Sequence, residues 1–291
     1  MKAPLNTILL FLLIIGFSGR VSGQDFQETK RLAERGLAFA QVNLGLMYDN
    51  GEGVPENDAE AVRWYRLAAE QGNACGQYKL GLMYALGEGV PEDDAEAVRW
   101  YRLAAEQGNA RAQFNLGNIY FNGTGVPENE AEAVKWYRLA AEQGNASAQY
   151  NLGVMFTNGT GVPENDAEAV RWYRLAAEQG NASAQYNLGN MYDSGEGVPE
   201  NDAEAVRWYR LAAKQGLSAA QLNLGYSYAN GEGVQQNNVR AYVWWSAGAA
   251  QGDENARGNR DIVSDRLTPD QLAQGQEMAT RCFESDYQDC E

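Results

Sequence analysis

The stretch AEAVRWYRLAAEQGNA at residues 59–74 decides the fold, because the chain repeats it. The same letters return at residues 95–110 and 167–182, with one change (Lys135) at 131–146, and in a degenerate form at 203–218. Its tryptophan recurs every 36 residues, at Trp64, Trp100, Trp136, Trp172, Trp208 and Trp244. A fixed period of about 20–50 residues is typical of stacked units that cannot bury their apolar faces alone. The sequence therefore predicts a repeat array.

Within the block, the apolar residues are spaced as on one side of a helix. Ala61, Trp64, Tyr65, Ala68 and Ala69 fall at i, i+3, i+4, i+7 and i+8, and charged residues occupy the other face. The aromatic pair has two interpretations: it packs between neighbouring helices, or it forms a ligand box. Strict recurrence favours packing, because every interface between repeats needs the same filler.

A second helix is predicted ahead of each block, for example over residues 74–86. Its centre reads Leu-Gly-x-x-Tyr, and a mid-helix glycine costs about 1 kcal/mol relative to alanine. We therefore expect a bulky aromatic side chain of the paired helix to approach this glycine closely. Asn-Gly and Gly-Val-Pro then end the helix, and Asn57 with Glu60 predicts a capping box for the next one. The recurring helix glycines are Gly45, Gly81, Gly117, Gly153, Gly189 and Gly225.

The two ends of the array differ from its centre. Residues 24–35 read as a truncated block and predict an N-terminal capping helix, since an array must shield its first open face. Residues 254–267 predict a further helix of the Leu-Gly type, and Thr268-Pro269 predicts the start of a last helix that reaches Glu284. The expected organisation is a separate segment at 1–23, the array at 24–252, and C-terminal capping helices at 253–291.

Residues 1–23 have the pattern of a signal peptide. Lys2 precedes an apolar run at residues 8–17, which is shorter than the roughly 20 residues needed to span a bilayer. Small residues at 21–23 predict cleavage before Gln24, and no cysteine follows for a lipid anchor. We therefore expect an exported protein, periplasmic or secreted, without a stable membrane anchor.

The chain is strongly acidic. Its formal net charge is −16, and loss of residues 1–23 with Lys2 and Arg20 makes it −18. Such a surface repels phosphate backbones, so nucleic acid and anionic lipid are unfavourable partners. The charge serves solubility, or it attracts a basic protein partner.

The cysteine and histidine content limits which catalytic and metal-binding chemistries are available to the chain. In an oxidising compartment, Cys282 and Cys290 are predicted to form a disulfide near the C-terminus, which leaves Cys75 as an inert thiol or an intermolecular link. Histidine is absent, which removes the commonest general base and metal ligand. We expect no cofactor, no metal site and no catalytic residue.

The strings Leu-Gly-x-x-Tyr and Ala-x-x-Trp-Tyr-x-x-Ala-Ala-x-x-Gly resemble the Sel1-like repeat, a relative of the tetratricopeptide repeat. The tetratricopeptide period is about 34, and Gln77 stands where its motif has tryptophan, so the Sel1-like match is better. The resemblance implies an all-α, right-handed α-solenoid of about six 36-residue antiparallel helix pairs. It also implies adaptor roles based on protein binding.

A comparison of the six copies indicates where a partner binds. The positions of the first helix that vary most are those of residues 75, 79, 82, 85 and 86, and four of them (75, 79, 82 and 86) form one stripe at i, i+4, i+7 and i+11; Phe121 stands at the position of residue 85. The stripe carries a ladder of asparagines, with apolar residues in its N-terminal half. The predicted partner-binding residues are Phe39, Asn43, Leu46, Lys79, Leu82, Leu86, Asn115, Asn118, Phe121, Asn151, Val154, Asn187, Asn190, Asn223 and Tyr226. The alternative is sequence drift on an unused surface.

The sequence therefore favours an exported scaffold that holds a peptide or protein segment in a concave groove, of unknown partner and oligomeric state. Two alternatives stay open. One is a cell-wall or β-lactam-directed hydrolase, for which the chain has no Ser-x-x-Lys string. The other is a structural protein that associates with itself.

Overall fold

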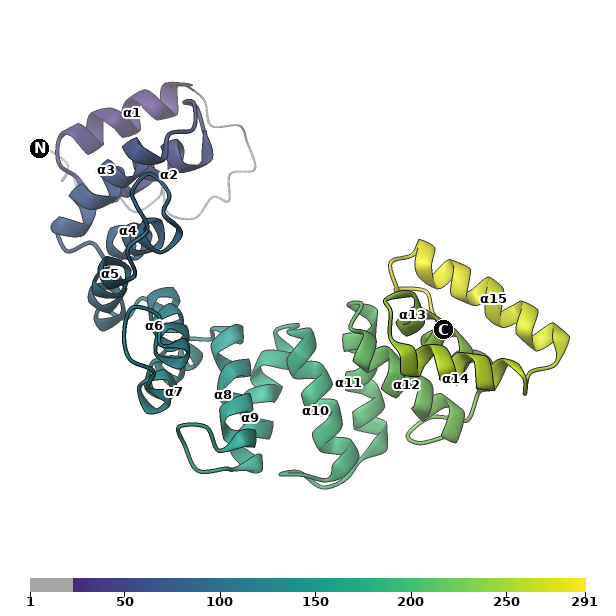
Figure 1. The fold of residues 1–291 in the computed structure, drawn as a ribbon. Coiled ribbons are helices and arrows are strands. Elements are labelled where there is room, and N and C mark those ends of the chain that lie inside the picture. Colours follow the sequence, from purple (N-terminus) through teal and green to yellow (C-terminus); the bar gives the residue numbers. More distant parts are fainter. Residues whose placement is uncertain (1–22) are drawn as a thin grey trace, which may run out of the picture. The chain divides into compact units, whose positions relative to one another are not determined.

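A computed structural model describes residues 23–291 and shows the predicted all-α repeat architecture. The predicted signal peptide lies almost wholly outside the described residues. Residues 23–291 form fifteen α-helices and no strand (Figure 1). The chain divides into two compact units, which meet within α5 at residues 104–105.

Unit 1 contains α1–α4 and most of α5. The helices are α1 (Gly23–Glu34), α2 (Ala38–Asn50), α3 (Asp58–Glu70), α4 (Ala74–Leu86) and α5 (Asp94–Glu106). The first helix packs on α2, where Phe26 and Ala33 join the core formed around Trp64. Helix α1 therefore closes the open face of the first repeat, as predicted.

Unit 2 contains the remaining helices. They are α6 (Ala110–Asn122), α7 (Glu130–Glu142), α8 (Ala146–Asn158), α9 (Asp166–Glu178), α10 (Ala182–Ser194), α11 (Asp202–Lys214), α12 (Ser218–Asn230), α13 (Asn238–Ala250), α14 (Glu254–Ser264) and α15 (Pro269–Glu284). We call the first helix of each repeat an A helix (α2, α4, α6, α8, α10, α12) and the second a B helix (α3, α5, α7, α9, α11, α13). Each A helix of unit 2 packs on its own B helix and on the preceding B helix of that unit, so the pairs stack consecutively.

The recurring tryptophans are core residues. The six indoles of the 36-residue series are each 8% exposed or less. In unit 2, Trp172 and Trp208 lie in one apolar cluster with Leu152 and Leu188, which are fully buried. The packing interpretation of these aromatic residues is confirmed.

The glycine at the centre of each A helix is explained by the aromatic residue that follows the repeat tryptophan. A Cβ atom on Gly189 would lie 2.6 Å from the ring of Tyr209, and one on Gly45 would lie 2.5 Å from Tyr65. Real Cβ atoms essentially never make such short contacts. The predicted close approach is confirmed, and it offsets the helix-propensity cost of the glycine.

The predicted capping box of Asn57 and Glu60 is only half right. The Asn57 side chain accepts the backbone N–H of Glu60 at 3.1 Å. However, the Asn57 N–H already donates to the carbonyl of Tyr48 at 2.9 Å, so Glu60 is not needed there and pairs with Arg63 instead. The full capping box occurs at α15, between Thr268 and Gln271.

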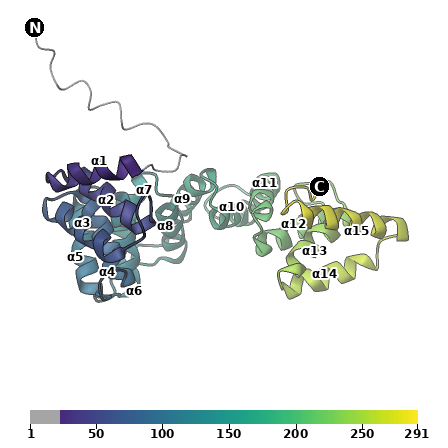
Figure 2. The same ribbon diagram turned by 90° about the horizontal axis from the view of Figure 1, so that it is seen from above.

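The C-terminal end closes the array with a polar surface. Helix α14 ends at Ser264, three residues earlier than predicted, because i→i+3 turns precede the extended residue before Pro269. Both α14 and α15 pack on α13, but they make few contacts with each other and diverge (Figure 2). The reason lies in α14, where Arg260 stands 36 residues after the fully buried Leu224 and Asp261 stands 36 residues after Gly225. A charged face of this kind cannot bury a B helix as the other A helices do.

Candidate functional site

The inner face of unit 2 is built around tyrosine hydroxyl groups that pass alongside the helix glycines. The ring of Tyr137 lies against Gly117, and its hydroxyl donates to Asn118 Oδ1 at 2.7 Å. The same hydroxyl is hydrogen-bonded to Asn151 of the next A helix. One B-helix tyrosine thus joins the predicted stripes of two successive A helices.

The next two repeats show the same arrangement. The Tyr173 hydroxyl lies 3.2 Å from the Thr157 hydroxyl and is also hydrogen-bonded to Asn187. The Tyr209 hydroxyl donates to Asn190 at 2.8 Å, and Asn223 Nδ2 donates to the same Asn190 oxygen at 3.2 Å. The asparagine ladder therefore has a structural role that the sequence pattern alone did not reveal. An amide has three or four hydrogen-bonding positions, so each asparagine still has capacity for a ligand.

Two adjoining depressions lie on this face of unit 2. The first has a volume of about 320 Å³ and lies between α6 and α8. The second has about 350 Å³ and lies between α8 and α10. They share Tyr150 and Val154 of α8, so they adjoin across this helix, and we call the two depressions together the inner groove. Of the predicted residues, it is lined by Asn118, Phe121, Asn151, Val154, Asn187 and Asn190.

The other predicted residues of unit 2 lie outside these depressions. Asn115 is half-buried on α6, and Asn223 is half-buried on α12. Tyr226 is 41% exposed, accepts a hydrogen bond from Asn259 at 2.7 Å and packs edge-on against Trp245. Tyr226 thus connects α12 to α14 and α13.

In unit 1 the predicted residues do not form one apolar patch. Phe39 and Leu86 are 51% and 56% exposed, but one lies in the first turn of α2 and the other in the last turn of α4. Leu46 packs against the core, and Leu82 is half-buried. Asn43 is exposed.

Lys79 is bound within unit 1 rather than free for a partner. Its ammonium lies 3.3 Å from the Asp49 carboxylate, and this pair is mostly buried. The Tyr65 hydroxyl donates to the same carboxylate at 2.9 Å. Burial raises the pKa of Tyr65, and the hydrogen bond to Asp49 raises it further. This ion pair replaces the asparagine contacts of the other repeats.

The buried tyrosines predict how stability depends on pH. Burial raises the pKa of Tyr137 to about 12, although its hydrogen bond to Asn151 acts in the opposite direction. Tyrosine in the unfolded chain ionises near pH 10. Above that pH the unfolded state therefore binds fewer protons than the folded state, and unfolding becomes more favourable. The contribution of Tyr137 to the free energy of unfolding is therefore present below pH 10 and is lost as the pH rises to 12.

We expect the free energy of unfolding to fall between pH 10 and pH 12, by up to about 2–3 kcal/mol for Tyr137 alone. Tyr137→Phe removes the ionisable group and should flatten this part of the curve. Urea unfolding at several pH values measures the effect. Tyr242→Phe, which changes a tyrosine outside the inner groove, is the control, and equal slopes in both variants would contradict the expectation.

Sequence reasoning missed a second ladder, made of buried glutamines. In unit 2, Gln149 is 3% exposed, donates to the Ala141 carbonyl at 3.0 Å and accepts from Gln179 at 2.7 Å. Gln185 and Gln221 repeat the pattern. These side chains satisfy carbonyl groups at B-helix ends and tie three helices together. The signal was present in the sequence, because the six A helices all have glutamine at this position: Gln41, Gln77, Gln113, Gln149, Gln185 and Gln221.

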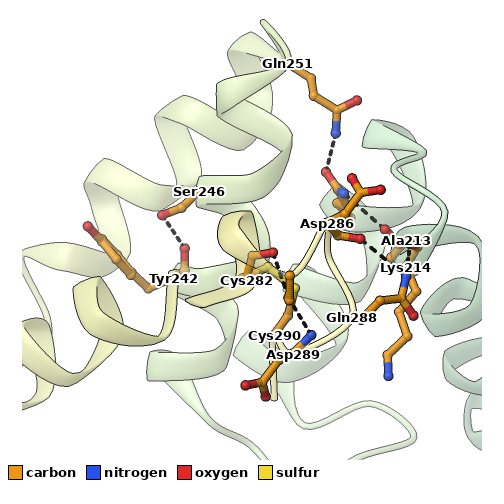
Figure 3. Close-up of a disulfide and its surroundings, with 12 residues drawn as sticks. Ala213, Lys214, Tyr242, Ser246, Gln251, Cys282, Asp286, Gln288, Asp289 and Cys290 are labelled. Carbon is orange, nitrogen blue, oxygen red and sulfur yellow. Dashed lines mark hydrogen bonds between the residues drawn. A yellow bond between two sulfur atoms is a disulfide. The ribbon is translucent and has the colours of Figure 1, made fainter. Parts of the chain in front are cut away.

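The C-terminal segment is fastened to unit 2 by the predicted disulfide. Cys282 and Cys290 are bonded and fully buried, and Gln288 donates to the Lys214 carbonyl at 2.9 Å (Figure 3). Glu291 accepts hydrogen bonds from Arg210 at 2.6 Å and from Tyr228 at 2.8 Å. In the single chain, Cys75 is an exposed thiol.

Residues 23–291 contain neither a metal-binding cluster nor a membrane-spanning helix. No group of three or more histidine, cysteine, aspartate or glutamate side chains in this part of the chain is placed to hold a metal ion. None of its helices is both long and apolar enough to cross a membrane.

The chain is similar to solved repeat structures. A Sel1 repeat protein from Oxalobacter formigenes is 34% identical, with a TM-score of 0.64, and the similarity covers 78% of this chain and 94% of that one. The c5321 protective antigen of uropathogenic Escherichia coli, which displays an SLR fold, is 29% identical with a TM-score of 0.50; 91% of this chain and 80% of that one are covered. A comparison with curated proteins found no match.

The family model for the Sel1 repeat matches six successive segments, at residues 38–73, 76–109, 110–145, 146–181, 182–217 and 218–253. These segments contain the A and B helices described above and take up most of the chain. With its helix pairs, its 36-residue period and its central glycines, the chain belongs to the Sel1 repeat family.

Proposed function

We propose that this chain is a binding scaffold that holds an extended segment of a partner protein in the inner groove of unit 2. Sel1 repeat proteins generally mediate protein–protein interactions, and solenoids of this family are typically not enzymes. The observation that carries the proposal is the pair of adjoining depressions, whose lining combines A-helix positions that vary between copies, such as those of Phe121 and Val154, with the recurring asparagines.

The chemistry of the groove suits an extended backbone. Asn151 and Asn187 line it with amide groups that have unused hydrogen-bonding capacity. Between them, Val154 and Tyr150 offer apolar surface, and Phe121 is 41% exposed at one end. A peptide backbone needs both donors and acceptors along its length, and its side chains need apolar contacts, so both requirements are met in one place.

The proposal is tested with Phe121→Ser and Val154→Ser in one double variant. Random 12-residue peptides displayed on phage are selected on the immobilised protein, and the enriched peptides are then titrated by calorimetry. The double variant should weaken their binding at least tenfold, since it removes apolar contacts at one end of the groove and at its centre. Because Val154 also packs against the apolar core, the melting temperature should fall somewhat, and circular dichroism checks that the variant is folded at the temperature of the titration.

The matched control is Leu139→Ser on α7. Leu139 is 38% exposed, close to the value for Phe121, but it lies on a B helix outside the groove. This variant should bind the selected peptides normally. A selection that enriches no peptide, or equal weakening by Leu139→Ser, would rule the proposal out.

We also propose that the protein is exported. The support is the buried Cys282–Cys290 disulfide, because such bonds persist mainly in oxidising compartments. Sequencing the N-terminus of the protein isolated from its host tests whether it is exported, and Gln24 is the expected first residue.

A further inference from the structure

The groove changes in chemical character from one A helix to the next. Phe121, Thr157 and Asp193 stand 36 residues apart, at the same position of α6, α8 and α10. Phe121 lines the first depression and Thr157 lines the second. Asp193 continues the series near Tyr209, whose pKa is raised by burial and further by the charge of Asp193. From α6 to α10, the side chain at this position is therefore aromatic, then a hydroxyl, then a carboxylate, of which the first two line the depressions and Asp193 lies outside them at the α10 end.

Further carboxylates gather at the α10 end. Glu196 lines the second depression. Desolvation raises the pKa of Asp193, and the charges of Asp202, Glu232 and Glu200 raise it further. None of these five carboxylates takes part in any of the ion pairs found in residues 23–291. Their negative charge is thus not neutralised by an ion pair within the described residues, which makes this end of the groove complementary to a positive group.

The spacing of the A helices determines how many residues of a bound peptide separate the Phe121 end of the groove from the Asp193 end. Packed helices lie about 8–10 Å apart, and an extended chain advances about 3.3 Å per residue. Successive A helices pack on a shared B helix and make few direct contacts, so they lie at least about this far apart, and each repeat corresponds to about three peptide residues or slightly more. From Phe121 on α6 to Asp193 on α10 is two repeats, which corresponds to about six residues.

Resting on the function proposed above, we infer that the partner segment is extended and asymmetric: an apolar side chain lies beside Phe121, and a lysine or arginine about six residues away lies beside Asp193 and Glu196. The apolar end is favoured by contact with exposed aromatic surface, and the basic end by Coulomb attraction in a partly desolvated groove. An acidic segment would meet like charges at the α10 end and is disfavoured there.

The composition of the peptides selected from the random library tests this inference. The expected result is enrichment of an apolar residue and a lysine or arginine separated by five to seven positions. Selection on a double variant, Asp193→Lys with Glu196→Lys, should replace the basic residue by aspartate or glutamate at the same separation. Both positions are exposed, so the variant is expected to fold, and circular dichroism checks that it does.

Calorimetric titration of selected peptides measures the charge preference quantitatively. Exchanging the lysine of a selected peptide for glutamate should lower its affinity at least tenfold in 50 mM salt, and the difference should shrink in 500 mM salt because charges are screened. Glu178→Lys, on α9 outside both depressions, is the matched control and should leave the preference unchanged. Peptides enriched without any charge preference would overturn this inference and leave the proposed function standing. A selection that yields no peptide would remove both.

Discussion

Replacing Trp172 by alanine is expected to destabilise the protein by about 3–5 kcal/mol. The indole is 4% exposed and lies in one cluster with residues of α7, α8, α9 and α10, so its loss leaves a cavity between stacked repeats. This cost is comparable to a large part of the roughly 5–15 kcal/mol that stabilises a typical domain. Urea unfolding of the whole chain, followed by circular dichroism, measures it.

Two variants of the same helix serve as comparisons. Trp172→Phe keeps a ring and removes an N–H that has no hydrogen-bond partner among residues 23–291, so it should cost less than half as much. Leu175→Ala changes a side chain that is 37% exposed and should cost about 1 kcal/mol or less. An unchanged unfolding midpoint for Trp172→Ala would contradict the packing of neighbouring repeats through their tryptophans.

The second large effect is expected for Gly153→Val. The new Cβ would lie 2.5 Å from Cδ1 and Cε1 of Tyr173. The ring has little freedom to move, because it packs against Tyr150 and its hydroxyl contacts Thr157. Overpacking of this kind costs about 1–3 kcal/mol and occasionally more, and here it also displaces α8 from α9. Denaturant unfolding again supplies the number.

A glycine in open surroundings provides the control for this variant. A Cβ added to Gly258 on α14 would meet no atom within 4 Å, so Gly258→Ala should stabilise the protein slightly through helix propensity. The double variant Gly153→Val with Tyr173→Ala should lose less stability than the sum of the two single variants, because the clash between the new valine side chain and the ring is absent from it. If the double variant were no better than the sum of its two parts, the glycine would owe its recurrence to something other than the tyrosine ring.

Much of the fold could be predicted because the chain contains six copies of one sequence unit. The 36-residue period of Trp64 and its equivalents defined the unit, and the helical spacing of the apolar residues defined the element type. The cost of a mid-helix glycine alone pointed to a close aromatic ring on the paired helix. Capping at Asn57 was predicted less well, because its N–H is satisfied by Tyr48 of the preceding helix, a contact that no local pattern reveals.

The candidate site was predicted in part. Variation among copies located the stripe, and six of its residues line the inner groove. The sequence could not show that the ladder asparagines are hydrogen-bonded to tyrosine hydroxyls, because the distance between those residues depends on how the helices pack. In hindsight, the near invariance of asparagine at the positions of Asn151, Asn187 and Asn223 indicates such a structural duty. Lys79 differs from that series because Asp49 is its partner in unit 1.

The charged side of α14 also bears on how a chain of this kind changes length over time. Since Arg260 and Asp261 exclude a further helix pair at one end and α1 occupies the other, new modules cannot be appended at either end of the array without rebuilding it. We expect duplication or deletion in the interior, where identical segments such as 95–110 and 167–182 supply matching junctions. If the groove holds a peptide as proposed, its reach changes in whole steps of 36 residues, each of which corresponds to about three residues of that peptide.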